Sequence, residues 1–132
     1  MEWDEERWPN FSPEEFSCPC GCGVLNVSER FLDKLQDVRY ALSATMKVTS
    51  GGRCPDYNMS LRARGFKSVD GSAHTMTEDE PCEAADIECT WGGLRHRLVT
   101  SLLQQFNRIG ISSSFIHVDS DQSKPQNVIW TY

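Results

Sequence analysis

The stretch Ser114-Phe115-Ile116-His117-Val118-Asp119 decides how the rest of the chain is interpreted. The aromatic and β-branched residues at 115, 116 and 118 favour a largely buried strand. Side chains two positions apart on a strand point to the same face, so His117 and Asp119 share one face. Such a pair suits a metal site in which the Asp is a ligand, a support for a ligand or a base. The pattern also fits a half-exposed strand with an ordinary polar face.

A second segment supplies further ligands. Gly71-Ser72-Ala73-His74 leads through an acidic loop to Glu83-Ala84-Ala85-Asp86-Ile87. Residues 84–87 have the composition of a short buried strand, in which the carboxylate of Asp86 needs a partner because an unpaired buried charge is costly. His74, Asp86 and His117 together form a known ligand set of catalytic zinc, with a fourth position left for water. We therefore predict one catalytic Zn²⁺ on these three residues.

Four motifs, which occur in order over residues 11–132, carry a family resemblance. They are Asn10-Phe11-Ser12-Pro13-Glu14-Glu15-Phe16 with Cys18, Cys20, Gly21 and Cys22; Ser50-Gly51-Gly52-Arg53-Cys54-Pro55 with Asn58; Ser72-x-His74 with Glu83-Ala84-Ala85-Asp86; and Phe115-Ile116-His117-Val118-Asp119. Together they resemble the zinc D-alanyl-D-alanine carboxypeptidase family. Its wider clan includes D-Ala-D-Ala dipeptidases, phage L-alanyl-D-glutamate endolysins and the hedgehog signalling domain.

The resemblance implies a zinc peptidase that hydrolyses peptidoglycan stem peptides, as a carboxypeptidase or as an endolysin-type endopeptidase. In that family the arginine at the position of Arg53 binds the terminal carboxylate of the substrate, and Ser72 falls in the substrate-binding motif. A surface arginine in a loop is the alternative reading of Arg53. A planar guanidinium at this position suits a carboxylate because it donates two parallel hydrogen bonds.

The general base cannot be taken over from the family pattern. The clan often has an acidic residue a few positions before the last histidine, but residues 111–116 contain none. Asp119 is our candidate base, and a supporting role behind His117 is the rival interpretation. Asp79 and Glu83 are weaker candidates. A non-catalytic zinc-containing binding module of the same fold is the alternative function, and a cysteine hydrolase has no sequence pattern in its favour.

One segment departs from the family pattern S-x-H-x-x-G-x-A-x-D. Eleven residues (75–85) separate His74 from Asp86, five more than in the pattern. The extra piece, residues 77–82, is acidic and contains a proline, so we expect a bulging loop that leaves the strand register unchanged. Because this loop lies beside a ligand, it bears on substrate access.

Composition restricts the partners. The chain has 132 residues, 39% of them hydrophobic, and a formal net charge of −6 with a pI near 5.0. This charge argues against binding to nucleic-acid phosphates, which needs clustered Lys and Arg. The acidic residues 1–7 do not resemble a signal peptide, and the sequence has no apolar run that could span a membrane. We expect a monomeric phage or prophage product, made in the bacterial host cytoplasm and acting on the cell wall after release.

The six cysteines are at positions 18, 20, 22, 54, 82 and 89. Without a secretion signal, disulfides are disfavoured. Cys18, Cys20 and Cys22 allow a structural metal, but their spacing lacks the usual C-x₂-C geometry and no histidine lies near. Reduced thiols in a tight glycine-rich loop are therefore the favoured interpretation.

The predicted fold is α+β, with helices packed on one face of a small, mainly antiparallel sheet and the metal over the other face. Residues 1–10 form an arm with Trp3 and Trp8, ahead of one domain at 11–132. We expect helices at 12–16 and 28–43, and a third from Leu94 to Phe106 after a break at Gly92-Gly93, with His96 on the surface. Expected strands cover 46–49, 84–87, 114–119 and 127–132, and another begins at 108–111. Residues 56–70, with Arg62, Arg64 and Lys67, are predicted to be an irregular or weakly helical, solvated flank.

Overall fold

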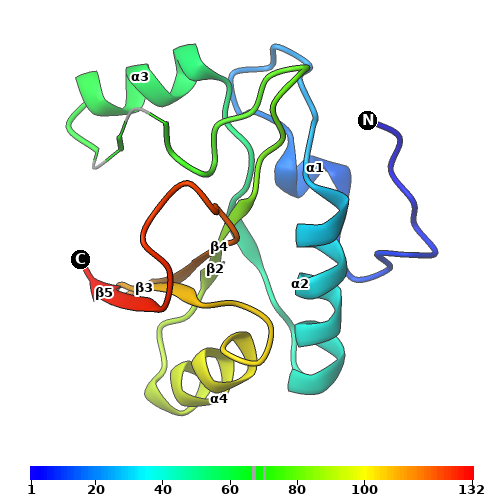
Figure 1. Cartoon of the computed structure of the whole chain (residues 1–132), viewed down its shortest axis with the longest axis vertical. Coiled ribbons are helices and arrows are strands. Elements are labelled where there is room, and N and C mark those ends of the chain that lie inside the picture. The colour runs from blue at the N-terminus through cyan, green and yellow to red at the C-terminus, as the bar shows by residue number, and fades with distance from the viewer. Residues whose placement is uncertain (67, 70) are drawn as a thin grey trace.

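Five short strands form one mixed sheet at the centre of the molecule (Figure 1). The computed structural model describes residues 1–66, 68–69 and 71–132. The strands are arranged in the order β1 (Val48–Ser50), β2 (Ala84–Glu88), β4 (Phe115–Asp119), β3 (Arg108–Ile111) and β5 (Val128–Thr131). Neighbouring strands are antiparallel except β3 and β5, which are parallel. The predicted α+β class with a mainly antiparallel sheet is confirmed.

The local sequence explains where the first two predicted helices begin. Helix α1 (Pro13–Phe16) follows Ser12, which forms a capping box with Glu15. Helix α2 (Glu29–Leu42) begins after Ser28, whose hydroxyl accepts a hydrogen bond from the backbone N–H of Phe31. The helix ends at Ser43, which adopts the left-handed conformation with φ 52°.

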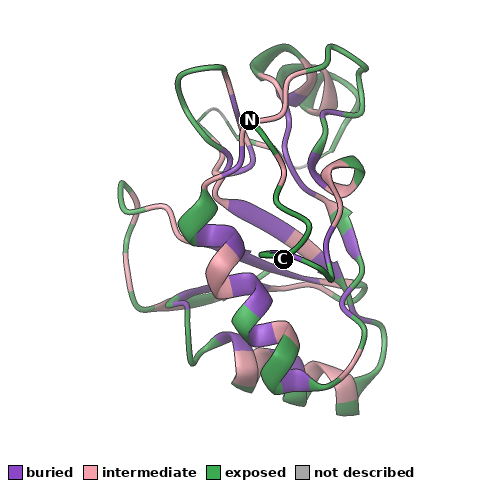
Figure 2. Cartoon of the chain, turned by 90° about the vertical axis from the view of Figure 1, so that its right-hand side faces the viewer, coloured by how far each residue is buried: buried purple, intermediate pink, exposed green. Residues whose placement is uncertain are grey.

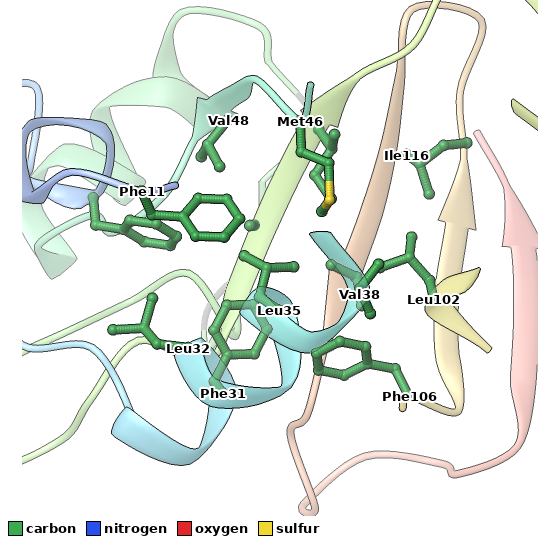
Figure 3. Close-up of a cluster of buried hydrophobic side chains, with 14 of the residues drawn as sticks. Phe11, Phe31, Leu32, Leu35, Val38, Met46, Val48, Leu102, Phe106 and Ile116 are labelled. Atoms are coloured by element: carbon green, nitrogen blue, oxygen red, sulfur yellow. The ribbon is translucent and has the colours of Figure 1, made fainter. Parts of the chain in front are cut away.

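The apolar stripe of α2 packs against α4 (Gly92–Leu102) and the sheet to form the core. Figure 3 shows Leu35 and Val38 of α2 in one cluster of buried side chains with Leu102, Phe106 and Ile116. Figure 2 shows buried and exposed stretches alternating along α2, as the helical spacing of its apolar residues requires. The predicted core role of these two helices is therefore confirmed.

The strand register separates the core from a polar face. On β2 and β4, Asp86 lies opposite His117, and Ala85 lies opposite Val118. Because side chains alternate along a strand, the apolar partners point toward α2 and α4 while Asp86 and His117 share the other face. Pairing of β2 with β4 thus brings two predicted metal ligands, Asp86 and His117, together.

Two local expectations were incomplete. Residues 56–63, in the flank predicted to be irregular or weakly helical, belong to a regular helix, α3 (Pro55–Ala63), which begins after Cys54 with Pro55 in its first turn. It stands apart from α2 and α4 (Figure 1), so not every helix lies on one face of the sheet. Lys67, which belongs to the same predicted flank, lies outside the described residues. Gly92 and Gly93 begin α4 rather than break the chain before it.

The N-terminal arm packs onto the body. Trp8 is fully buried, and its ring lies 5.2 Å from that of Trp3 in an edge-to-face arrangement. The indole N–H of Trp8 donates to Asp33 on α2 at 2.9 Å, and Arg7 donates two more hydrogen bonds to the same carboxylate. Within the described residues, no helix is long and apolar enough to cross a membrane.

Candidate metal centre

The three predicted ligands come from two strands and one loop. Asp86 and His117 are cross-strand neighbours on β2 and β4. His74 lies in the loop that precedes β2, and this loop is hydrogen-bonded to the segment that carries Arg53. The Arg53 N–H donates to the His74 carbonyl at 2.8 Å, and the Met76 N–H donates to the Arg53 carbonyl at 2.8 Å. These bonds fix His74 and Arg53 relative to each other.

The ligand atoms form a small triangle. Asp86 Oδ1 lies 2.9 Å from His117 Nδ1 and 3.3 Å from His74 Nε2, and the two imidazole nitrogens are 3.2 Å apart. In a tetrahedral zinc site with bonds near 2.0 Å, ligand atoms lie about 3.3 Å apart. The predicted set of His74, Asp86 and His117 is therefore a group that could hold a metal ion, and a zinc ion fits its dimensions.

The outer nitrogen of each imidazole has its own acceptor. His74 Nδ1 lies 2.7 Å from the carbonyl oxygen of Gly51, and His117 Nε2 lies 2.7 Å from Asp119 Oδ2. Because both acceptors lack a hydrogen, the outer nitrogens carry the N–H groups. The inner nitrogens of the neutral rings then direct lone pairs toward each other and toward a carboxylate oxygen. Three converging acceptors repel one another unless a cation or a proton lies between them. Histidines that bind a metal show this arrangement, with the outer ring nitrogen bonded to a fixed partner.

Electrostatics around the triad agree with this arrangement. Burial would raise the pKa of Asp86, but hydrogen bonds with His117 and His74 outweigh burial and hold its pKa far below its usual range. Burial lowers the pKa of His74. Burial acts in the same direction on His117, but its bonds to Asp119 and Asp86 outweigh it and raise the pKa. Because an imidazole must be neutral to bind a metal ion, the raised pKa of His117 means that protonation competes with metal binding, which is therefore favoured as pH rises.

Asp119 lies behind His117 with both oxygens engaged. Oδ2 accepts from His117 Nε2, while Oδ1 accepts from Arg108 Nε at 2.7 Å and from the Asp121 N–H at 3.1 Å. The residue is only 2% exposed. Sequence analysis made Asp119 the candidate base, but this geometry favours the rival role, in which it orients His117. Alternation along the strand correctly placed both side chains on one face, but it could not show which ring nitrogen meets the carboxylate.

Arg53 is a buried cation beside the triad. Its side chain lines the same cleft as the three ligands, and the residue is 9% exposed. Burial lowers its pKa, and nearby Asp86 opposes that shift. Among the described residues, Arg53 Nε has no hydrogen-bond partner. A buried donor without a partner is costly, so this site is suited to an anionic ligand that supplies the missing acceptor.

A cleft of about 970 Å³ gives access to these residues. Ser72 lines it, as expected for a residue near the substrate, and its hydroxyl accepts from the His74 N–H at 3.3 Å. Sequence analysis missed the other walls, which are rich in aromatic side chains. These include Tyr57 and Phe66 on the α3 side, and Phe115, Trp130 and Tyr132 on the sheet side.

Trp130 reaches the centre because Gly110 has no side chain. Gly110 lies between His117 on β4 and Trp130 on β5, and a Cβ atom there would lie 2.7 Å from the indole ring. The indole lies 5.5 Å from the His117 ring and stacks over the Arg108 guanidinium at 5.0 Å. The signal for this wall is the parallel pairing of β3 and β5, which the sequence pattern of either strand does not reveal.

The inserted segment, residues 77–82, points away from the cleft. Its turn is closed by a hydrogen bond from the Thr77 N–H to the Glu80 carbonyl, and the Asn26 side chain donates to two of its carbonyls. Cys82 is buried, and its backbone forms an isolated β-bridge with Val27. None of residues 77–82, all of them described, lines the cleft. The expected loop is present, β2 keeps Asp86 opposite His117, and access to the triad is left open.

The remaining base candidates also lie outside the cleft lining. Asp79 belongs to the exposed turn of the insertion, and Glu83 follows it. Burial raises the pKa of Glu83, and the nearby carboxylates of Asp121 and Asp119 add to this effect. Neither side chain is placed to take a proton from a group bound at the triad.

A second group of possible ligands lies at the thiols. The sulfur atoms of Cys18, Cys20, Cys22 and Cys54 all lie within 4.8 Å of one another. From the sequence, free thiols were favoured at Cys18, Cys20 and Cys22, because their spacing lacks the usual C-x₂-C geometry and no histidine lies near. Cys54 was not grouped with them. Cys82 and Cys89 are buried elsewhere in the core.

We compared the chain with protein-family models, with curated proteins and with solved structures, and none of these comparisons gave a match. The functional argument therefore rests on the residues and their geometry.

Proposed function

We propose that this protein is a zinc-dependent peptidase of the D-alanyl-D-alanine carboxypeptidase type that hydrolyses peptidoglycan stem peptides. The observation that carries the proposal is the triad of His74, Asp86 and His117, whose inner atoms converge while outer partners hold both rings. A metal on three protein ligands retains an open position, which is the hallmark of a catalytic rather than a structural site. The three ligands themselves line a cleft large enough for a peptide.

The chain's own residues would divide the work as follows. His74, Asp86 and His117 would hold the ion, and Asp119, itself fixed by Arg108, would keep the His117 ring in the tautomer that presents Nδ1. When bound, zinc supplies a Lewis acid and an activated water. Peptide hydrolysis additionally needs the substrate to be held in register, which is the role we assign to a different part of the cleft.

Arg53 would bind the terminal carboxylate of the stem peptide. Its buried guanidinium lacks a partner at Nε among the described residues, and it lines the cleft beside the ligands. Tyr132 lies in the same cleft, and burial raises the pKa of its hydroxyl, so it stays protonated at neutral pH. It can therefore donate a hydrogen bond to a substrate oxygen. Ser72 would contact the peptide near His74.

The protein would act as a monomer on the cell wall, as a phage or prophage product released from the host cytoplasm. A peptidoglycan stem peptide ends in a carboxylate and carries no phosphate, which suits a single buried arginine rather than a broad basic surface. The chain's formal net charge of −6 likewise favours a small ligand of this kind over a nucleic acid.

One observation favours a different function. In the described part of the cleft, the lining carboxylates are those of Asp86 and Asp119, and both are committed to histidine contacts. A group that accepts a proton from the attacking water is thus not evident. The alternative is a zinc-containing module of the same fold that binds stem peptides without cleaving them.

Mass spectrometry of muropeptides, before and after treatment with zinc-loaded protein, tests the proposal. Loss of a terminal D-Ala indicates a carboxypeptidase. Cleavage of a peptide bond inside the stem, such as the L-alanyl-D-glutamate bond, indicates an endopeptidase. Asp86→Ala should abolish either change, whereas Asp79→Ala, in the exposed turn, should leave it intact. Unchanged muropeptides that still co-sediment with fully zinc-loaded protein would establish the binding module instead.

A further inference from the structure

We propose that Cys18, Cys20, Cys22 and Cys54 form a second metal site, a closed tetrathiolate centre for zinc that fastens the N-terminal loop to the start of α3. The Cys18 and Cys20 sulfurs are 3.3 Å apart, those of Cys20 and Cys54 are 3.7 Å apart, and all four lie within 4.8 Å of one another. In a tetrahedral site with Zn–S bonds near 2.3 Å, sulfur atoms lie about 3.8 Å apart. The cluster therefore has the size of a zinc site.

The loop is shaped to gather its three thiols. Cysteines two apart on a straight strand would project their side chains about 6.5–7 Å from one another. Here the Gly21 N–H donates to the Cys18 carbonyl at 3.2 Å and closes a turn with Pro19 at its second position. Gly21 and Gly23 have φ of 79° and 82°, a conformation that glycine adopts without strain. This curvature turns an unusual C-x-C-x-C spacing into a converging set of sulfurs.

The fourth thiol comes from the N-terminus of a helix. Cys54 caps α3, and its sulfur accepts a hydrogen bond from the Tyr57 N–H at 3.4 Å. The Cys54 N–H in turn donates to the Cys18 sulfur at 3.3 Å. Backbone donors and the positive end of the helix dipole both stabilise negative charge on sulfur, as metal-bound thiolates require. Soft thiolate ligands in a tetrahedral set select zinc among the common divalent ions.

The position of this site gives it a consequence for the cleft. Cys54 directly follows Arg53, and Pro19 of the thiol loop lines the cleft. The Gly52 N–H also donates to the Phe16 carbonyl at 3.1 Å, so the loop and the Arg53 segment already meet. A metal on the four thiols would hold the main chain at Arg53 in place. This consequence rests on the proposed function, whereas the metal site itself does not.

Zinc stoichiometry of the full chain, measured by native mass spectrometry after purification with a reductant, tests the site. We expect two zinc ions in the wild type, one in a Cys20→Ser/Cys22→Ser double variant and one in His117→Ala. Cys89→Ser, which changes a buried thiol outside the cluster, should keep two. A double variant that holds as much zinc as the wild type would overturn the site. If the triad binds no zinc but the thiol cluster does, the wild type should hold a single ion. That ion should remain in His117→Ala and be lost in the Cys20→Ser/Cys22→Ser variant.

A second measurement uses the wild type and so does not depend on how the variants fold. Cys20 and Cys22 are exposed, so iodoacetamide can reach both sulfur atoms when no metal ion is bound to them. We expect peptide mapping to show both protected until a strong zinc chelator is added. Equal labelling with and without chelator, or disulfides among the four cysteines in protein purified with reductant, would overturn the proposal.

Discussion

The His74–Asp86–His117 triad and the four-thiol cluster are built on opposite kinds of scaffold. Two triad ligands stand on paired strands that are backed by the core, and each imidazole has an outer hydrogen-bond partner. The thiol cluster lies on a short loop and a helix end, and two of its four ligands are exposed. Three ligands facing a cleft leave room for chemistry, whereas four thiolates complete a tetrahedron and leave none.

This contrast also predicts how each region responds to losing a metal. The triad's strands are held by ladder hydrogen bonds and apolar packing, so its geometry should survive in the metal-free protein. The thiol loop is closed by one backbone turn and exposes Cys20 and Cys22, so we expect its order to depend on an ion bound at the thiols. We therefore expect the fold to preorganise the triad, and a metal ion at the thiols to help order its own loop.

The largest expected effect comes from breaking the triad alone. His117→Ala should remove one zinc ion and lower peptidase turnover by at least about 10³-fold, since the activated water and Lewis acid are worth several kcal/mol. The thiol cluster should keep its metal, because it shares no ligand with the triad. Zinc content and muropeptide hydrolysis, measured on the same preparation, check this separation. Loss of both ions from a folded variant would show that the two regions are not independent.

Asp119→Asn tests whether the triad owes its precision to outer partners. The amide can no longer fix His117 as a neutral donor through a charged acceptor, so we expect roughly a 10- to 100-fold loss in zinc affinity or activity. Competition with a calibrated chelator measures the affinity. The control is Asp79→Asn, because Asp79 lies in the distant turn of residues 77–82. Asp121→Asn is unsuitable, because the Asp121 N–H donates a hydrogen bond to Asp119. Unchanged zinc affinity with a larger loss of turnover would instead restore Asp119 as the base.

Arg53→Lys probes the point where the two regions meet. Lysine keeps the charge but loses the planar pair of donors, so we expect kcat/KM to fall by roughly 5- to 30-fold, equivalent to about 1–2 kcal/mol. Both zinc ions should remain bound. Arg97→Lys, on α4 and away from the cleft, is the matched control, because its guanidinium donates to the Leu42 carbonyl. Normal kinetics for Arg53→Lys would exclude a carboxylate clamp at this position.

The smallest effect is expected outside both regions, where Asp33 anchors the arm. Hydrogen bonds from Arg7 hold the pKa of Asp33 below its usual range, and Trp8 contributes in the same direction. A depressed pKa stabilises the fold above the unfolded-state pKa near 3.9, and this contribution is lost as pH falls through that value and below. Because the pair is substantially exposed, Asp33→Asn should cost only about 0.5 kcal/mol at pH 7. Urea unfolding at pH 7 and pH 3 should show the difference from wild type shrinking in acid.

The triad could be predicted from sequence because its evidence is local and chemical. Period-two alternation placed His117 on a polar face, and the ligand types suggested zinc before any pairing of strands was known. The sequence did not predict contacts between distant residues that no motif or ligand set linked. Cys54 meets its partners from more than thirty positions away, and Arg108 supports Asp119 through a pairing of β3 with β4. The strand period could not decide whether Asp119 acts as a base or supports His117, because the rotation of the imidazole ring determines which nitrogen faces the carboxylate.

The indole of Trp130 lies over Gly110 and beside His117, so its fluorescence can report on the metal centre. Its emission should respond to a metal ion bound by His117, since the indole ring lies 5.5 Å from the imidazole ring. The other tryptophans, Trp3, Trp8 and Trp91, lie in the arm or ahead of α4. Replacing Trp3 and Trp91, which are not fully buried, would leave a nearly pure signal against the constant background of Trp8. Occupancy of the cleft's centre could then be followed by light in real time, without a label and without a substrate.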